Sequence, residues 1–212
     1  MRDFFEKRMN GYDAHMMNNI ESARLFYPYT AQCLPGTEEC RILDLGCGTG
    51  LELTEYFMRN PGAHVTGIDL SEKMLDVLRA KHPDKDLTLL CGSYFDLPFG
   101  IRCFDAAVSV ESLHHFTMEE KIPLYRKLRD ALKDGGYLIL TDYFAESDTQ
   151  ECAFREALER CKAEEGIHDH ESYHFDTPLT VAHETQALLQ AGFSSVQVCD
   201  SWGATYTLRA NR

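Results

Sequence analysis

Residues 41–50 read Arg-Ile-Leu-Asp-Leu-Gly-Cys-Gly-Thr-Gly, a short apolar run that carries one carboxylate and ends in three alternating glycines. Glycine accepts positive φ and has no Cβ, so this backbone can bend sharply and lie against a ligand. A helical pattern begins near Leu51, and Thr49 could cap that helix. A strand, a glycine turn and a helix N-terminus in this order predict a nucleotide site in an open parallel sheet.

The spacing of the glycines distinguishes between kinds of nucleotide. The dinucleotide fingerprint G-x-G-x-x-G requires glycine at position 51, where this chain has Leu51, and the third glycine is Gly50. In that fingerprint the third glycine allows close packing of helix and strand beside a pyrophosphate. The sequence therefore disfavours a dinucleotide such as NAD. Asp44, two residues before the first glycine, suits either a ligand with positive charge or a carboxylate that orders the turn.

Composition limits the class of protein. The chain has 212 residues, 44% of them apolar, eight cysteines and a formal net charge of −13. This is enough for one domain with a full core, and we expect a single domain over residues 1–212. There is no run of 18 apolar residues, and the N-terminal stretch MRDFFEKRMN is charged, so neither a membrane span nor a signal peptide is expected. The cysteines form no C-x-x-C pair, which predicts reduced thiols in a cytoplasmic protein.

The acidic charge also bears on the partners. Non-specific binding to nucleic acid depends on basic patches, so we expect no nucleic-acid partner and a small-molecule substrate instead. The densest basic stretch, 121–133, has the spacing of a helix face. A homodimer is compatible with the composition.

A second carboxylate follows one strand later. Residues 64–70 read as a strand that ends in Asp69, 23 residues after Gly46. An acidic residue about 20 residues beyond the glycines commonly accepts hydrogen bonds from a nucleotide ribose. Asp69 could instead cap the helix that begins at Ser71, but its place at a strand end favours ribose binding.

Further strands are predicted at 87–91, 104–110 and 137–144. Ligands of open α/β sheets lie outside the carboxyl ends of the strands, so residues 110–115 should line the pocket. Glu111 could stabilise a cationic cofactor, steer a cationic substrate, or be a solvated acid at the strand end. Asp142 and Tyr143 should emerge on the same side.

Three strings of this chain resemble class I S-adenosylmethionine (SAM)-dependent methyltransferases, in particular the small-molecule, ubiquinone/menaquinone methyltransferase-like members. Residues 44–50, Asp-Leu-Gly-Cys-Gly-Thr-Gly, resemble motif I, and Leu-His-His-Phe at 113–116 recurs in the family. Residues 92–99 are similar to the family stretch Gly-Asp-Ala-x-x-Leu-Pro-Phe, with Ser93 in place of the acid and Tyr94 in place of the alanine. Two alternating segments near the C-terminus, 195–199 and 204–209, match the antiparallel hairpin of that fold.

The resemblance implies an α/β fold, Rossmann-like, with a seven-stranded and mostly parallel sheet of order 3-2-1-4-5-7-6. It also implies an N-terminal helical lid over 1–34 and a substrate cap of helix and loop over 145–180. The cofactor would be SAM, with S-adenosylhomocysteine as product. The expected cofactor-binding residues are Asp44, Gly46, Cys47, Gly48, Asp69, Leu70, Ser93, Tyr94, Val110 and Glu111. The glycine turn would hold the methionine end of SAM and Asp69 the ribose. Ser93 would contact the adenine, and Tyr94 would stack on the base or fill core.

Methyl transfer needs alignment of the reacting groups, and it needs a general base only if the acceptor is protonated. The candidate bases are Tyr12, His114, His115 and His174. Tyr12 stands where related enzymes place a lid tyrosine, although it could simply pack at a helix start. The histidines of the loop 166–178 could face the substrate or the solvent, and their spacing matches no closed metal site, so no metal is predicted. Two other functions stay open: a SAM-binding sensor or scaffold without catalysis, and an RNA or protein methyltransferase with a basic groove.

Overall fold

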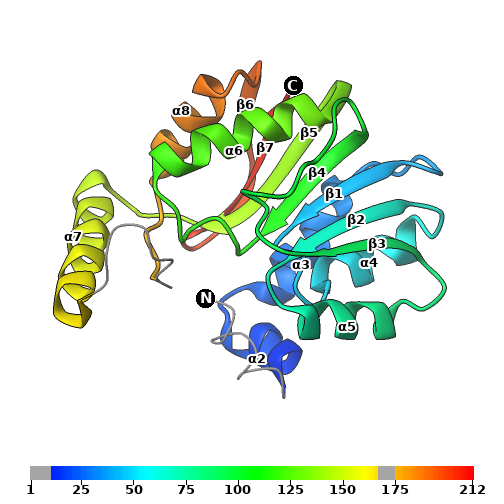
Figure 1. Ribbon diagram of the computed structural model, residues 1–212, viewed down its shortest axis with the longest axis horizontal. Coiled ribbons are helices and arrows are strands. Elements are labelled where there is room, and N and C mark those ends of the chain that lie inside the picture. The colour runs from blue at the N-terminus through cyan, green and yellow to red at the C-terminus, as the bar shows by residue number, and fades with distance from the viewer. Residues whose placement is uncertain (1–10, 167–174) are drawn as a thin grey trace.

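A computed structural model describes residues 11–166 and 175–212, which contain a seven-stranded sheet of order β3-β2-β1-β4-β5-β7-β6 (Figure 1). The strands are β1 (Arg41–Leu45), β2 (His64–Asp69), β3 (Asp86–Cys91), β4 (Phe104–Val110), β5 (Leu132–Tyr143), β6 (Ser195–Trp202) and β7 (Thr205–Asn211). Strands β1 to β5 pair in parallel, whereas β7 pairs antiparallel with both β5 and β6. The predicted fold class, strand order and terminal hairpin are confirmed.

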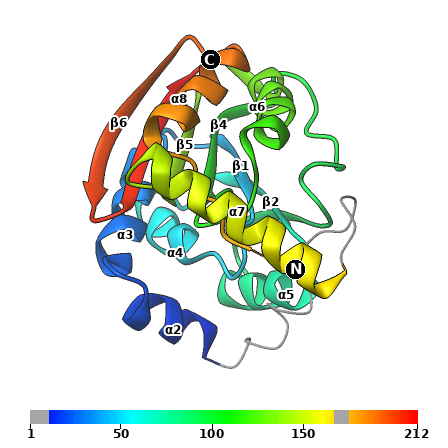
Figure 2. The same ribbon diagram turned by 90° about the vertical axis from the view of Figure 1, so that its left-hand side faces the viewer.

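Helices cover both faces of the sheet. The helices of the described residues are α2 (Tyr12–Asn19), α3 (Ala23–Cys33), α4 (Leu51–Arg59), α5 (Glu72–Lys81), α6 (Met118–Ala131), α7 (Asp148–Glu165) and α8 (Val181–Gln190). Ile42 of β1 belongs to the apolar cluster formed with α3, α4 and α5, whereas Leu43 belongs to the cluster formed with α6 and α8. Because adjacent residues of a strand point to opposite faces, a continuous apolar run is what such a doubly covered strand requires. Figure 2 shows α7 lying outside these two layers.

The two N-terminal helices have different surroundings. Helix α3 buries Phe26, Tyr27 and Ala31, so it is part of a core layer. Helix α2 has no buried residue, and Asp13 ties it to the glycine turn by accepting a hydrogen bond from Thr49 Oγ1 at 2.6 Å and pairing with Lys81. Both helices reach the cavity that is described below, α2 through Tyr12 and α3 through Tyr27, and the role of the segment 1–34 as a lid stays a prediction.

Glycine is required in the turn after β1 for reasons of both conformation and space. Gly46 and Gly50 have φ of +73° and +70°, in the left-handed region that other residues rarely adopt. A Cβ on Gly46 would lie 2.1 Å from Ser112 Oγ, and one on Gly50 would lie 2.4 Å from a methyl of Leu78. The turn can therefore take this shape, against α5 and the end of β4, only with glycine.

Two local expectations were wrong. Thr49 does not cap α4, because its hydroxyl donates to Asp13, and the helix follows Gly50 with no side-chain cap. The strand predicted at 137–144 begins earlier than expected. Strand β5 already begins at Leu132, and a register shift opposite Phe104 and Ala106 accommodates Gly135 with its φ of +77°.

A capping box begins α6 and makes its stability testable. Thr117 Oγ1 accepts the Glu120 N–H at 3.4 Å, and the Glu120 carboxylate accepts the Thr117 N–H at 2.8 Å. We expect Thr117→Ala to lower the free energy of unfolding by about 1 kcal/mol in urea denaturation. Thr37→Ala, at an exposed loop position, should change it by less than about 0.5 kcal/mol. Equal effects of the two variants would contradict the assigned cap.

Candidate functional site

A cavity lies at the carboxyl ends of β1, β2 and β4. It encloses about 720 Å³, part of it open to solvent, and none of the described residues that line it is a lysine or arginine. Eight of the ten predicted cofactor residues line it: Gly46, Cys47, Gly48, Asp69, Leu70, Tyr94, Val110 and Glu111. The glycine turn and the end of β2 are thus brought to one wall, as expected from the parallel sheet.

Asp69 joins the glycine turn to the start of α5. One carboxylate oxygen accepts the Gly48 N–H at 3.0 Å and the other accepts the Ser71 N–H at 2.8 Å. Burial nevertheless raises the pKa of Asp69 above its ordinary value. The cap of α5 itself is Ser71, whose hydroxyl accepts the Met74 N–H. Asp69 is therefore more than a cap, because it also lines the cavity and holds the turn.

Asp44 does not line the cavity. Its side chain is buried beneath the turn beside Glu52 of α4, and Glu52 lines the cavity instead. Burial and the neighbouring Glu52 raise the pKa of Asp44 well above its usual range, and burial raises the pKa of Glu52 as well. Asp44 Oδ2 and Glu52 Oε1 have no hydrogen-bond partner in the described structure. The sequence reasoning missed Glu52, although an acid in the first turn of the helix after the glycines was a visible signal.

Ser93 and Tyr94 have separate roles in the wall. Ser93 Oγ accepts the Phe95 N–H at 3.1 Å and is not among the residues that line the cavity. The Tyr94 ring does line it, and its hydroxyl donates to the Ser112 carbonyl at 3.1 Å. Lys127 Nζ fixes this segment by donating to the carbonyls of Tyr94 and Phe95 at 2.6 and 2.8 Å.

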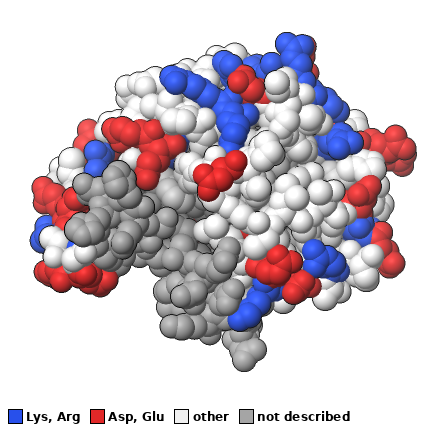
Figure 3. All heavy atoms as spheres, viewed as in Figure 1, with Lys and Arg blue, Asp and Glu red and all other residues white. Residues whose placement is uncertain are grey.

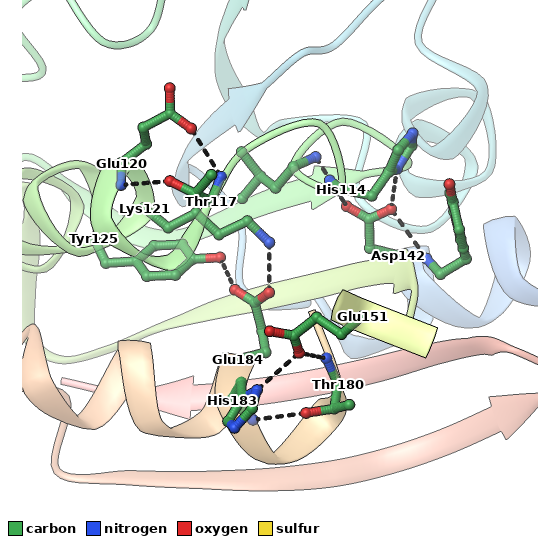
Figure 4. A network of polar contacts seen from close by, with 12 residues as sticks. His114, Thr117, Glu120, Lys121, Tyr125, Asp142, Glu151, Thr180, His183 and Glu184 are labelled. Atoms are coloured by element: carbon green, nitrogen blue, oxygen red, sulfur yellow. Dashed lines mark hydrogen bonds and ion pairs between the residues drawn. The ribbon is translucent and has the colours of Figure 1, made fainter. Parts of the chain in front are cut away.

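His114 is held from below by the end of β5. Its Nδ1 lies 2.5 Å from Asp142 Oδ1, and Asp142 Oδ2 accepts the backbone N–H groups of Leu113 and His114 (Figure 4). Burial opposes charge on this imidazole, but the Asp142 carboxylate outweighs it, so the pKa of His114 is raised. His114 is not among the residues that line the cavity. It is placed to support the loop rather than to meet a ligand.

His115, the next residue, does line the cavity. Its Nδ1 lies 2.9 Å from Asp176 Oδ1, and the Tyr143 hydroxyl donates to the same carboxylate. Burial lowers the pKa of His115 below its ordinary value, and Asp176 only partly offsets this. His115 is therefore neutral near pH 7. Asp176 was missed in the sequence, where it was one acid in a loop unlike the family.

Of the other two candidate bases, Tyr12 and His174, the structure describes only Tyr12. Tyr12 lines the cavity, and burial together with Asp69 and Glu52 raises the pKa of its phenol well above the ordinary value. It is thus a hydrogen-bond donor rather than a base at neutral pH. His174 lies outside the described residues.

Two groups of side chains have the composition of metal ligands. The ligand atoms of His114, His115 and Asp176 lie within 4.8 Å of one another, and so do those of Glu111, His114 and Asp142. His114 Nδ1 and Asp142 are already within hydrogen-bond distance, as are His115 Nδ1 and Asp176. These pairs form a hydrogen-bonded network in which the groups satisfy one another, and the prediction that no metal binds stays a prediction.

The fold and the cavity define an open α/β protein with a cavity at the carboxyl ends of its parallel strands and an acid–histidine cluster at the same edge of the sheet. A methyltransferase-domain family profile matches residues 42–136. An uncharacterized methyltransferase of Staphylococcus carnosus is 32% identical over 149 residues, which cover 69% of each chain. A demethylmenaquinone methyltransferase of Symbiobacterium thermophilum is 39% identical over 152 residues, 66% of this chain and 57% of the relative.

The structural comparison agrees on the fold. A chain of the Haloferax volcanii complex between the Trm112 methyltransferase activator and a methyltransferase superposes with a TM-score of 0.71 at 19% identity, covering 100% of this chain and 98% of that chain. This protein belongs to the class I SAM-dependent methyltransferase family, and its cofactor is SAM. Within the described residues no helix is both long and apolar enough to cross a membrane.

Proposed function

We propose that this protein transfers the methyl group of SAM to a small-molecule acceptor and releases S-adenosylhomocysteine. One observation carries the proposal: the same cavity is lined by the glycine turn and Asp69, which follow β1 and β2, and by Glu111 and His115, which follow β4. We call these two groups of residues its first and second ends. The first end has the groups for a nucleoside, and the second has titratable groups that a nucleoside does not need. The acceptor would lie at the second end.

The residues of the first end fit SAM. A Cβ built on Gly48 meets nothing closer than the Gly46 carbonyl at 4.0 Å, so this part of the turn is open to a ligand. Glu52 Oε1 is buried without a partner among the described residues, and an ammonium such as that of the methionine end would satisfy it. Asp69 keeps lone pairs on both oxygens for the ribose hydroxyls. Tyr94 offers an aromatic wall.

At the second end the protein would supply position and a proton acceptor. Bound SAM supplies a methyl group that its sulfonium has already activated, so alignment is the main requirement. We propose His115 as the general base for an acceptor that carries a proton at neutral pH. It is neutral, lines the cavity and is oriented by Asp176, whereas His114 with Asp142 holds the loop from which His115 extends.

The alternatives make different predictions. A sensor or scaffold would bind SAM without forming product. An RNA or protein methyltransferase would need positive charge at the cavity, but the Lys and Arg side chains on the face shown in Figure 3 gather mainly over α6 and the adjoining edge. In the part of the chain that the structure describes, none of them lines the cavity. The net charge of −13 also disfavours a nucleic-acid partner.

Two measurements test the proposal. Isothermal titration should show binding of S-adenosylhomocysteine, and incubation of the protein with SAM and a cell metabolite extract should release S-adenosylhomocysteine. Binding without release would favour the sensor. If S-adenosylhomocysteine did not bind at high micromolar concentrations, the proposal would be wrong. If it were released only after RNA or protein was added, the acceptor would be a macromolecule rather than a small molecule.

The role of Asp69 can be tested before any acceptor is identified. We expect Asp69→Ala to weaken S-adenosylhomocysteine binding about 100-fold, because two hydrogen bonds to a charged group contribute together about 3 kcal/mol. Asp84→Ala removes an exposed acid after α5 and should leave the affinity within about twofold. Calorimetry on both variants, with circular dichroism as a check of folding, measures the difference. An unchanged affinity in Asp69→Ala would contradict the ribose assignment.

For the compartment we propose the cytoplasm. All eight cysteines are free thiols, and disulfides are typical of oxidising compartments. A homodimer is also proposed on the sequence alone, and size-exclusion chromatography with light scattering would test it.

A further inference from the structure

Glu111 has an unusual backbone and an unsatisfied side chain. It follows β4 with φ of +50°, in the left-handed region, while its N–H donates to the Thr141 carbonyl at 2.9 Å. Residues with a Cβ rarely adopt this conformation, and strained residues of this kind cluster at functional sites. Its Oε1 is buried with no hydrogen-bond partner in the described structure, and the residue lines the cavity. A ligand in the cavity that donates a hydrogen bond would satisfy this oxygen.

The surroundings of this carboxyl determine which ligand would suit it. The titratable groups that face it are Asp142 and Tyr143 of β5, His114 of the following loop, Asp176 of the segment before α8, and Tyr12 and Tyr27 of α2 and α3. Burial first, and then the Asp142 charge, raise the pKa of Glu111 to about 8. Among residues 11–166 and 175–212, no lysine or arginine lines the cavity. A carboxylate or phosphate on the acceptor would be repelled here, whereas a cation would be attracted.

The cofactor does not account for this acid. SAM has one ammonium, and the unpartnered oxygen of Glu52, next to Asp44 and the glycine turn, is available for it. The sulfonium of SAM has no hydrogen to donate, so it cannot satisfy Glu111 Oε1 by a hydrogen bond. Glu111 lies on the β4 side with His115. Aromatic side chains also line the cavity, among them Tyr12, Tyr27 and Tyr94, and their ring faces attract cations.

We propose that the methyl acceptor is a small molecule that carries a protonated amine, and that Glu111 is the anionic partner of this amine. The inference rests on the proposed function. It assigns Glu111 to acceptor recognition rather than to the cofactor. Because the carboxyl is largely protonated near pH 7 in the free protein, binding of an ammonium should ionise it and release up to one proton.

The test uses matched amines, alcohols and acids as probes on the protein saturated with S-adenosylhomocysteine. The aromatic set is phenethylamine, 2-phenylethanol and 3-phenylpropionate, and the aliphatic set is butylamine, butanol and butyrate. In calorimetry we expect the amine of at least one set to bind tenfold or more tightly than its alcohol and acid. Titrations in two buffers of different ionisation enthalpy should show proton release at pH 7. The affinity for the amine should rise from pH 6 through about 8, since the carboxylate forms over this range.

Glu111→Gln keeps the shape of the side chain and removes its charge. It should reduce the affinity for the amine at least tenfold and abolish the proton release, whereas Glu119→Gln on the exposed side of α6 should do neither. The proposal is overturned if an alcohol or acid binds as tightly as its amine, if the preference survives in Glu111→Gln, or if no amine binds at 10 mM. It is also overturned if Glu111→Gln weakens the binding of S-adenosylhomocysteine as much as it weakens the binding of the amine. Failure of the wild-type protein to bind S-adenosylhomocysteine would instead overturn the proposed function.

Discussion

Replacing His115 with alanine is expected to reduce the rate of S-adenosylhomocysteine formation at saturating SAM by 10²- to 10⁴-fold, the range of a lost general base. His115 lines the cavity, and Asp176 orients its ring from 2.9 Å. Its pKa lies below the ordinary value of about 6.5 because of burial, so it is unprotonated at neutral pH. The measurement is product formation with a metabolite extract, beside calorimetry of S-adenosylhomocysteine binding, which the substitution should leave within about threefold.

The pH dependence gives this prediction a second readout. A base must be unprotonated, so kcat should be level at pH 7 to 8 and fall as the pH decreases through the lowered pKa of His115. Asp176→Asn removes the carboxylate that favours the charged imidazole, and it should shift this acid limb to still lower pH. His64→Ala, at the opposite end of β2, is the matched control and should retain the wild-type rate. A rate for His115→Ala within threefold of that control would remove His115 from the mechanism.

Local signals in the sequence were sufficient to predict which residues meet at the glycine-turn side of the cavity, where we propose that the nucleoside binds. Helix α4 begins at Leu51 directly after the glycines, and Ser71 caps α5 as its position predicts. Asp69 reaches the glycine turn because β1 and β2 pair in parallel, with Leu45 opposite Ile68. Each of these predictions depends on a pattern of residues close in sequence and on the rule that ligands lie at the carboxyl ends of parallel strands. Both can be applied to the sequence alone.

The parts that the sequence did not predict depend on tertiary neighbours. Threonine is a common N-cap residue, but the Thr49 hydroxyl donates its hydrogen bond to Asp13 of α2 instead. Asp44 stands in the family motif, yet packing beneath the turn leaves Glu52 on the cavity wall. Asp176 reaches His115 from 61 positions further along the chain, and no spacing rule connects them. The proposed acceptor end is therefore assembled from separate loops. Residues far apart in sequence meet there only in the folded chain, so the sequence alone did not predict its chemistry.

A buried ion pair between α6 and α8 leads to the largest expected change in stability. Lys121 Nζ lies 2.5 Å from Glu184 Oε2, and the Tyr125 hydroxyl donates to the other oxygen of the same carboxylate (Figure 4). The side chains of Lys121 and Glu184 are only 2% and 1% exposed. Glu184→Ala would leave the Lys121 ammonium buried without its partner, and we expect a loss of 3–5 kcal/mol in the free energy of unfolding, about what breaking a buried pair costs.

Urea denaturation of three variants separates the buried charge from lost packing. The exposed pair of Arg79 and Asp76 on α5 is the control, and Arg79→Ala should cost at most about 1 kcal/mol. The double variant Lys121→Met with Glu184→Leu replaces both charges by apolar groups of similar size, and it should recover most of the loss seen in Glu184→Ala. A double variant as unstable as the single one would mean that shape, or the hydrogen bond from Tyr125, accounts for the effect. The pair would then be a packing element rather than an electrostatic link between the two helices.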